Sequence, residues 1–266
     1  MEQRKLENQE GNGDSSLKNA ILHFIVALQN KIVNQIVTFG YKLDNSGETM
    51  VRLGTIYGGW WIPKTLIGKA DEKRVAISVG IGHDVSFDKE LLSSGFTVIA
   101  LDPLEVCVAF AREELKEFPK IHLENLGLAS FSGEERFFAP KHEGHDSWSS
   151  TNSQITERDK SAVFQVISLP DLLTKYETQT INATSVLKMD IEGAESKIIP
   201  SLCNLEYSFD YVAIEMDFLS LIPFVQIRKR VEHIREARFL LEKMKIRGYR
   251  LILRENFNYF WVYKPD

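Results

Sequence analysis

The segment Val186-Leu187-Lys188-Met189-Asp190-Ile191-Glu192-Gly193-Ala194-Glu195 decides the fold, because it joins an apolar strand to a helix through two acidic residues and a glycine. An open α/β sheet binds its ligands beyond the carboxyl ends of its strands. The side chains of Asp190 and Glu192 are therefore expected where chemistry takes place. The alternative is that these acids only cap the helix that follows, whose amino end favours negative charge.

Strands and helices are expected to alternate on both sides of this segment. Strands are predicted over residues 75–79, 97–101, 121–126 and 211–215, and helices lie between them. A long amphipathic helix over residues 227–247 ends at Gly248, and a closing hairpin follows over residues 249–253 and 257–263. Ser168 is a predicted helix cap with Pro170 just inside. The stretch up to Arg158 is polar and irregular, and only residues 163–167 are expected to be extended after it. This order predicts a mainly parallel sheet.

The front of the chain is organised differently. Residues 1–16 form a charged lead-in that we expect to be disordered. Residues 17–70 form a helical and capping segment, and a charged run at Asp71 marks the start of the main domain, residues 71–266. Apolar residues recur every three or four positions from Leu17 to Phe39. This stripe predicts a helix that packs on the domain or pairs two subunits. No apolar run in it is long enough to span a membrane.

Composition excludes some classes of function. The net charge of -5 over 266 residues argues against a general nucleic-acid binder. The two cysteines, Cys107 and Cys203, are far apart in the sequence and are expected to be reduced thiols. We therefore expect a cytoplasmic protein.

A glycine turn follows the first predicted strand, in Ser78-Val79-Gly80-Ile81-Gly82-His83-Asp84. Glycines let a backbone approach a ligand closely, and a helix amino end offers free N–H groups. Asp102 ends the second strand, twenty residues beyond Gly82, where a carboxylate can accept both hydroxyls of a ribose. The spacing suits a nicotinamide cofactor and S-adenosylmethionine equally well, although Val85 occupies the place of the third glycine of the dinucleotide motif.

Two loops are candidate walls of the site. Gly58-Gly59-Trp60-Trp61 either makes a turn with core aromatics or, with Tyr57, covers the site. The loop of residues 141–150 carries His142 and His145, whose spacing suits metal binding on a helix. Gly144 and the polar neighbours argue against a helix there, so we expect no metal. Substrate contacts are expected from Tyr57, Trp60 and Trp148.

Residues 75–263 resemble the FkbM-type S-adenosylmethionine-dependent methyltransferases. The resemblance is carried by LKMDIEGAE at residues 187–195, Asn125-Leu126-Gly127-Leu128, the serine-containing loop Ser147 to Ser150, and the run from Val166 to Leu173. The family commonly opens with D-x-G-A-N-I-G, where this chain has the sequence from Ser78 to Asp84. With this version of the motif the chain resembles a methyltransferase-like branch of the same superfamily. The departure leaves the class of methyl acceptor open.

The resemblance implies a class I methyltransferase fold, which is a Rossmann-like α/β fold. Its mainly parallel sheet has seven strands and a C-terminal antiparallel hairpin, with helices on both faces and here an N-terminal helical extension. It also implies S-adenosyl-L-methionine as cofactor and methyl transfer to a hydroxyl of a small molecule, sugar or glycan. The expected cofactor contacts are Ser78, Gly80, Ile81, Gly82, Asp84, Ser86, Asp102, Pro103, Asn125, Gly127, Leu128, Ser150, Asp190 and Glu192.

Three residues are candidates for the base that removes the hydroxyl proton, namely His145, Asp190 and Glu215, and spacing alone does not choose between them. Two other classes share the front-half features. A nicotinamide-dependent oxidoreductase would use the same glycines and Asp102, although LKMDIEGAE counts against it. A protein that binds the cofactor without turnover would look the same there.

Overall fold

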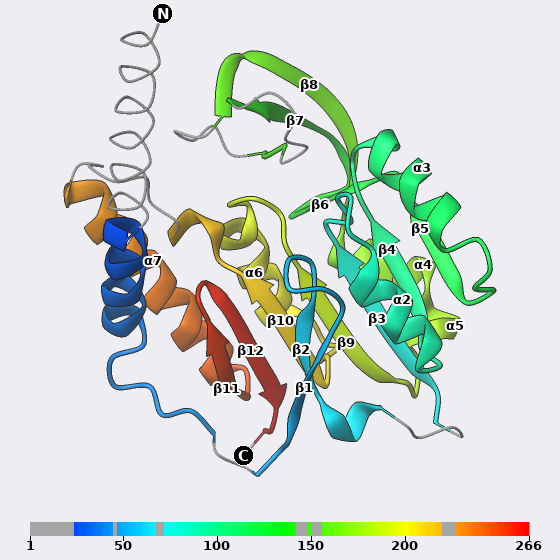
Figure 1. Ribbon diagram of the computed structural model, residues 1–266, viewed down its shortest axis with the longest axis horizontal. Helices are drawn as coiled ribbons and strands as arrows, with labels where there is room; N and C mark the ends of the chain where they lie inside the picture. Colours follow the sequence, from blue (N-terminus) through cyan, green and yellow to red (C-terminus); the bar gives the residue numbers. More distant parts are fainter. Residues whose placement is uncertain are drawn as a thin grey trace, which may run out of the picture.

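The computed structural model describes residues 24–44, 47–67, 72–141, 148–150, 156–219 and 227–265 (Figure 1). The strands are β1 (Met50–Leu53), β2 (Trp60–Pro63), β3 (Arg74–Val79), β4 (Thr97–Leu101), β5 (Ile121–Glu124), β6 (Gly127–Ala129), β7 (Gly133–Pro140), β8 (Thr156–Ser168), β9 (Thr184–Met189), β10 (Tyr211–Glu215), β11 (Tyr249–Glu255) and β12 (Asn258–Tyr263). The helices are η1 (Lys64–Leu66), α2 (Ser86–Ser93), α3 (Glu105–Glu114), α4 (Leu169–Lys175), α5 (Glu177–Thr180), α6 (Glu195–Asn204), η2 (Asp217–Leu219) and α7 (Ile227–Ile246). An N-terminal helix over residues 24–37 precedes them.

The centre of the molecule is a seven-stranded sheet in the order β11-β12-β10-β9-β3-β4-β5. The strands from β10 to β5 run parallel, whereas β12 is antiparallel to both β10 and β11. The chain leaves β3 toward β4 on one side and returns to β9 on the other. The sheet therefore has a switch point at β3, where α/β proteins bind ligands. The predicted α/β class, mainly parallel sheet and final hairpin are confirmed.

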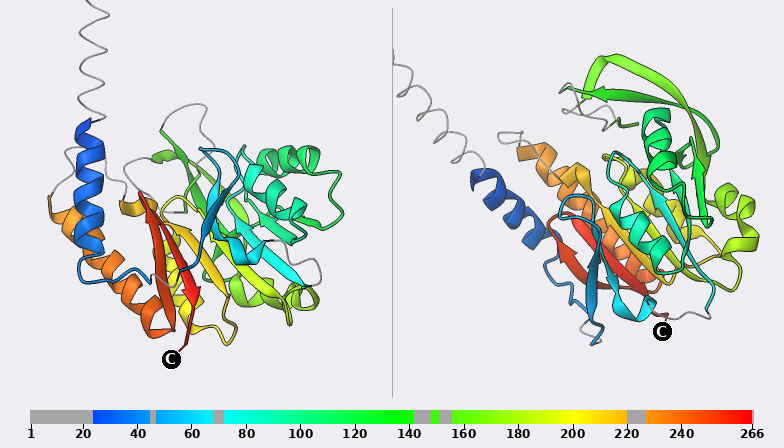
Figure 2. Two further views of the ribbon diagram at one scale, coloured as in Figure 1. Left: turned by 60° about the horizontal axis from the view of Figure 1, so that its bottom comes forward. Right: turned by 45° about the vertical axis from the view of Figure 1, so that its right-hand side comes forward.

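Alternate residues of β3 pack into two separate hydrophobic cores. Val75, Ile77 and Val79 belong to one apolar cluster, which α4, α6 and α7 complete. Ala76 belongs to a second cluster, with apolar residues of α2, α3, β1 and β2. Because successive side chains of a strand point to opposite faces, this division places helices on both faces of the sheet, as Figure 2 shows.

The predicted cap of α4 is confirmed. Ser168 is its N-cap, its Oγ accepts a hydrogen bond from the backbone N–H of Asp171, and Pro170 lies in the first turn. Such caps satisfy donors that the helix itself cannot pair.

Residues 133–168 depart from the sequence analysis. The stretch expected to be irregular contains the eight-residue β7, and the short extended segment is part of the 13-residue β8. The two strands pair antiparallel and rise as an arch beyond the carboxyl edge of the main sheet (Figures 1 and 2). The arch has only a small apolar cluster, centred on Phe137 and Val166. Its weakly alternating sequence therefore gave little strand signal.

The front segment packs against the main domain. The β1–β2 hairpin places Leu53, Trp60 and Ile62 in the same core as α2. The N-terminal helix lies against α7 and the C-terminal hairpin (Figure 1), and it buries Val33, Asn34 and Val37. The apolar stripe that the sequence predicted to pack on the domain or on a second subunit lies on the other face of this helix.

In that stripe, Phe24, Leu28, Ile32, Ile36 and Phe39 are exposed by 46–78%. Leu17, Ala20 and Ile21 lie outside the described residues. The stripe does not make the contact within the chain, and its pairing with a second subunit stays a prediction. Within the described residues, no helix combines the length and apolar character needed to cross a membrane.

Polar groups hold the N-terminal helix in place. The Tyr259 hydroxyl donates to Oδ1 of the buried Asn34 at 2.7 Å. Nη1 of Arg254 donates to the Asn34 carbonyl at 2.8 Å, and Nη1 of Arg238 donates to the Ile36 carbonyl at 2.9 Å. These hydrogen bonds make the contact specific.

We expect Tyr259→Phe to lower the free energy of unfolding by about 1–3 kcal/mol, because it leaves a buried amide oxygen without its donor. Tyr263→Phe is the control, since its half-buried hydroxyl has only a 3.5 Å contact with Arg247. Urea denaturation followed by circular dichroism measures both variants. Equal stability of the two variants would show that the Asn34 contact is dispensable.

Candidate active site

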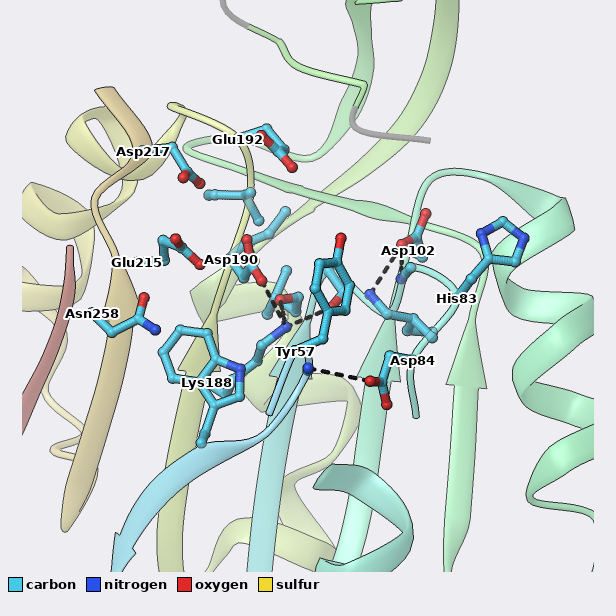
Figure 3. Close-up of a pocket in the computed structure, with 18 of the residues that line it drawn as sticks. Tyr57, His83, Asp84, Asp102, Lys188, Asp190, Glu192, Glu215, Asp217 and Asn258 are labelled. Atoms are coloured by element: carbon cyan, nitrogen blue, oxygen red, sulfur yellow. Dashed lines mark hydrogen bonds and ion pairs between the residues drawn. The ribbon is translucent and has the colours of Figure 1, made fainter. Parts of the chain in front are cut away.

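A cavity of about 870 Å³ opens at the carboxyl ends of β3, β4, β9 and β10 (Figure 3). The glycine turn after β3 and the end of β4 form one side. The acidic ends of β9 and β10 form the other, and the front turn of residues 56–61 contributes a wall. The cavity therefore lies at the switch point, and its volume is in the usual range of ligand sites.

Gly80 is required by the close approach of two strand ends. It has φ +82°, and a Cβ atom there would lie 1.9 Å from the carbonyl oxygen of Asp190. No other residue fits without separating β3 from β9. The glycine turn thus fixes the position of Asp190 as well as the shape of the cavity floor.

Asp102 organises the glycine turn. Its Oδ2 accepts hydrogen bonds from the backbone N–H groups of Ile81 at 3.0 Å and Gly82 at 3.1 Å, and its Oδ1 accepts one from Leu104 at 2.9 Å. Burial raises the pKa of this carboxyl, against the opposing effect of these bonds. Asn125 supports the same corner by donating to the carbonyls of Asp102 and Pro103.

Asp84 anchors the front turn over the cavity. Its Oδ2 accepts from the Thr55 hydroxyl at 2.5 Å and from the Gly58 N–H at 3.2 Å, and its Oδ1 accepts from the Ser86 N–H at 2.9 Å. Burial acts to raise the pKa of Asp84, but the hydrogen bonds outweigh it and hold the pKa below its usual value. Ser86 adds a second anchor, because its Oγ accepts from the Thr55 N–H at 2.8 Å.

The opposite end of the cavity gathers acids from two neighbouring strands. Met189 pairs with Ile214, so Asp190 lies beside Glu215, and Asp217 follows at the start of η2. One carboxylate oxygen from each of the three acids lies within 4.8 Å of the others. Burial and the neighbouring carboxylates raise the pKa of Glu215 to about 8 and the pKa of Asp217 well above its usual value.

Lys188 links the two central strands beneath these acids. Its side chain is 8% exposed, and its Nζ donates to the carbonyls of Val79 at 3.2 Å and Gly80 at 2.5 Å. The same Nζ lies 3.6 Å from Oδ2 of Asp190 and 5.4 Å from the ring centre of Trp60. Lys188 therefore positions Asp190 and the indole wall together (Figure 3).

The loop after Asp190 has an unusual backbone. Glu192 has φ +56°, a region that non-glycine residues seldom occupy. The hydroxyl of the buried Ser149 donates to the Glu192 carbonyl at 2.6 Å. Glu195 stabilises the loop, because its Oε1 accepts hydrogen bonds from the backbone N–H groups of Ile191 and Gly193. Burial raises the pKa of Glu195 to about 8.

Most of the predicted site residues meet in this cavity. Those that line it are Tyr57, Trp60, Gly80, Ile81, Gly82, Asp84, Asp102, Pro103, Gly127, Leu128, Trp148, Asp190, Glu192 and Glu215. Ser78, Ser86, Asn125 and Ser150 are not among the lining residues. Ser78 is buried in β3, and Ser150 contacts Lys197. His142 and His145 lie outside the described residues.

Sequence reasoning missed Lys188, Asp217 and Ser149. A lysine inside an otherwise apolar strand is itself a signal, because a buried ammonium group needs partners. Asp217 could have been found as an acid two residues beyond Glu215, just after the strand. Nothing in the serine-containing loop distinguishes Ser149 from Ser150 before the backbone is placed.

The model of the methyltransferase FkbM domain matches residues 64–251, and the chain belongs to this family. Its members use S-adenosylmethionine, and the protein is an S-adenosylmethionine-dependent methyltransferase. The nicotinamide-dependent alternative is therefore wrong. None of the curated proteins matches the chain.

Solved structures resemble the chain only distantly. A putative methyltransferase of Streptococcus mutans in complex with SAH is 11% identical, with a TM-score of 0.37 over 72% of this chain and 88% of that one. A precorrin-6y C5,15-methyltransferase of Geobacter metallireducens is 11% identical, with a TM-score of 0.37 over 84% and 98%. A SAM-dependent methyltransferase of Aquifex aeolicus is 14% identical, with a TM-score of 0.35 over 75% and 86%.

The cavity suits the cofactor by the chemistry of its lining. S-adenosylmethionine has ribose hydroxyls at one part and an ammonium group at another, and both donate hydrogen bonds. Carboxylates stand at both sides of the cavity, with Asp102 on one and Asp190 and Glu192 on the other. The lining therefore offers acceptors of the kind that both groups of the cofactor require.

We expect Lys188→Met to lower the free energy of unfolding by about 1–3 kcal/mol, because it leaves the carbonyls of Val79 and Gly80 without their buried donor. It also removes the cation beside Asp190. The matched control is Lys197→Met, whose half-exposed ammonium group pairs with Glu135 at 3.3 Å. Thermal and urea unfolding measure both. If Lys197→Met lowers the free energy of unfolding as much as Lys188→Met does, Lys188 has no special role in stability.

Proposed function

We propose that the protein transfers a methyl group to a hydroxyl oxygen of a small molecule or sugar. The observation that supports this most is the pairing of Asp190 and Glu215 at the end of a cavity walled by Tyr57, Trp60 and Trp148. Carboxylates accept hydrogen bonds from hydroxyl groups, and aromatic rings pack against the apolar faces of sugars and similar molecules.

In this proposal the cofactor occupies the side of the cavity formed by Gly80, Gly82, Asp102 and Pro103, with Gly127 and Leu128 beside them. Asp102 accepts hydrogen bonds from the ribose, and Glu192 and Asp190 face the amino-acid portion. Asp84 and Ser86 act indirectly, since both hold the front turn. Ser78, Asn125 and Ser150 would support the turns from outside the cavity.

The cofactor supplies an electrophilic methyl group, so the protein chiefly orients the acceptor. Alignment of two bound reactants is worth roughly 7–11 kcal/mol. A hydroxyl must also lose its proton, and a positioned base accelerates that step by about 100- to 10,000-fold. We assign this role to Asp190, which Lys188 holds at 3.6 Å, with Glu215 as the neighbouring carboxyl.

We also propose the class of acceptor, the oligomeric partner and the cellular compartment of the protein. The acceptor is a small molecule or glycan and not a nucleic acid, in keeping with the net charge of -5. The exposed stripe of the N-terminal helix is the surface through which we expect a homo-oligomer to form. Both cysteines are free thiols, which supports a reducing, cytoplasmic environment.

We expect Asp102→Ala to weaken binding of S-adenosylhomocysteine by about 1.5–3 kcal/mol, the value of a hydrogen bond to a charged group. Isothermal titration calorimetry measures the affinity, and circular dichroism verifies the fold. NADH is the control ligand and should not bind. Unchanged affinity in a folded variant would show that Asp102 only holds the glycine turn.

We expect Asp190→Asn to reduce turnover by at least about 100-fold, because it keeps the shape of the side chain and removes the base. Transfer of a labelled methyl group to a panel of hydroxylated acceptors measures this, and Asp159→Asn on the exposed part of β8 is the control. NMR of the product identifies the methylated atom. A methylated nitrogen or carbon would contradict the proposed transfer to oxygen. A near-normal rate of the Asp190→Asn variant would show that the acids only cap the following helix.

A further inference from the structure

The acidic end of the cavity has the composition of a cation site. We propose that Asp190, Glu215 and Asp217, with the side-chain oxygen of Asn258, bind a hard divalent cation such as Mg²⁺, Mn²⁺ or Ca²⁺. Such ions take oxygen ligands from carboxylates and amides. The cation extends the proposed function, but its binding does not depend on which acceptor is methylated.

The distances suit one ion. Oxygens from the three acids lie within 4.8 Å of one another. Around an ion with oxygen contacts of about 2.3–2.6 Å, ligands on opposite sides are roughly 4.6–5.2 Å apart, and adjacent ligands are closer. The three carboxylates can therefore reach a common centre with little movement, and the shorter contacts of Mg²⁺ need a small contraction.

Buried acceptor atoms around the acids lack donors. Oδ2 of Asp217, Oδ1 of Asn258 and Oε2 of Glu195 are all buried with no hydrogen-bond partner among the described residues. Asn258 pairs with Glu215 across β10 and β12, and both side chains border the cavity (Figure 3). Glu195 is fully buried under the loop that carries Asp190. Unsatisfied buried oxygens are costly, and a bound cation would satisfy those that face it.

The charge balance supports the same conclusion. The negative charges of Asp190, Glu192, Glu195 and Glu215 all act on Asp217. Lys188 contributes one positive charge and already pairs with Asp190. Of the other acids that line the cavity, Glu255 is neutralised by Arg52 at 2.7 Å. Asp84 and Asp102 accept hydrogen bonds from backbone N–H groups. The excess of negative charge therefore lies at this end of the cavity, around the three proposed ligands.

The fold explains why these groups meet. Asp190 directly follows β9, Glu215 ends β10 and Asn258 begins β12, so three adjacent strands bring oxygen ligands to one edge of the sheet. Ligands that come from one edge of the sheet leave coordination positions toward the cavity for other groups. In the proposed reaction those positions would take water or an oxygen of the acceptor, which would hold the hydroxyl near Asp190.

The test uses the full-length protein, treated with EDTA and desalted, in the absence of cofactor and acceptor. Titration with Mn²⁺, followed by electron paramagnetic resonance, should show one tightly bound ion per chain, and Mg²⁺ or Ca²⁺ should displace it. We expect Asp217→Asn and, separately, Glu215→Gln to weaken Mn²⁺ binding at least about 10-fold. Glu255→Gln, an acid of the same cavity outside the cluster, should leave it unchanged.

Three results would overturn the proposal. They are no binding of Mn²⁺ or Ca²⁺ by the folded wild-type protein, equal binding by wild type and both cluster variants, and displacement of Mn²⁺ by S-adenosylhomocysteine. The last result would assign the cluster to the cofactor's ammonium group. Because no methyl transfer is measured, a failure here is distinct from a failure of the proposed O-methylation.

Discussion

The ammonium group of Lys188 is the interaction on which the site depends. It binds the carbonyls at the end of β3 and the carboxylate that follows β9, so it joins the two strands between which the cavity opens. The absence of a side chain at Gly80 allows the same two strand ends to touch. One buried cation and one missing side chain together set the spacing between the glycine turn and the acidic loop.

From that junction the cavity divides into two chemically different halves. Backbone N–H groups of the glycine turn bind Asp102, so hydrogen bonds within the protein already define the shape of that half. The acidic half is the reverse, because its carboxylates crowd together and retain buried oxygens without donors. A preformed half suits a cofactor of constant shape. A half with unsatisfied acceptors suits groups that bring positive charge or hydroxyl protons.

The sequence predicted what depends on local pattern. Strand order, the cap at Ser168 and the hairpin after Gly248 all follow from periodicity and from residues with strong conformational preferences. It did not predict β7 and β8, since an arch with a small apolar core has weak alternation. It proposed Asp190 and Glu215 separately, yet their meeting with Asp217 and Asn258 depends on which strands become neighbours. The exposed stripe of the N-terminal helix shows the same limit, because Asn34 faces the domain through hydrogen bonds that hydrophobicity does not report.

The bond from Ser149 to the Glu192 carbonyl has a mechanical consequence. Ser149 pairs with Phe138 of the arch, while Glu192 belongs to the backbone turn that carries the carboxylates. The arch is therefore tied by a hydrogen bond to a residue whose φ angle is unfavourable for a non-glycine residue. A displacement of the arch would therefore be passed through this hydrogen bond to the backbone that carries Asp190 and Glu192.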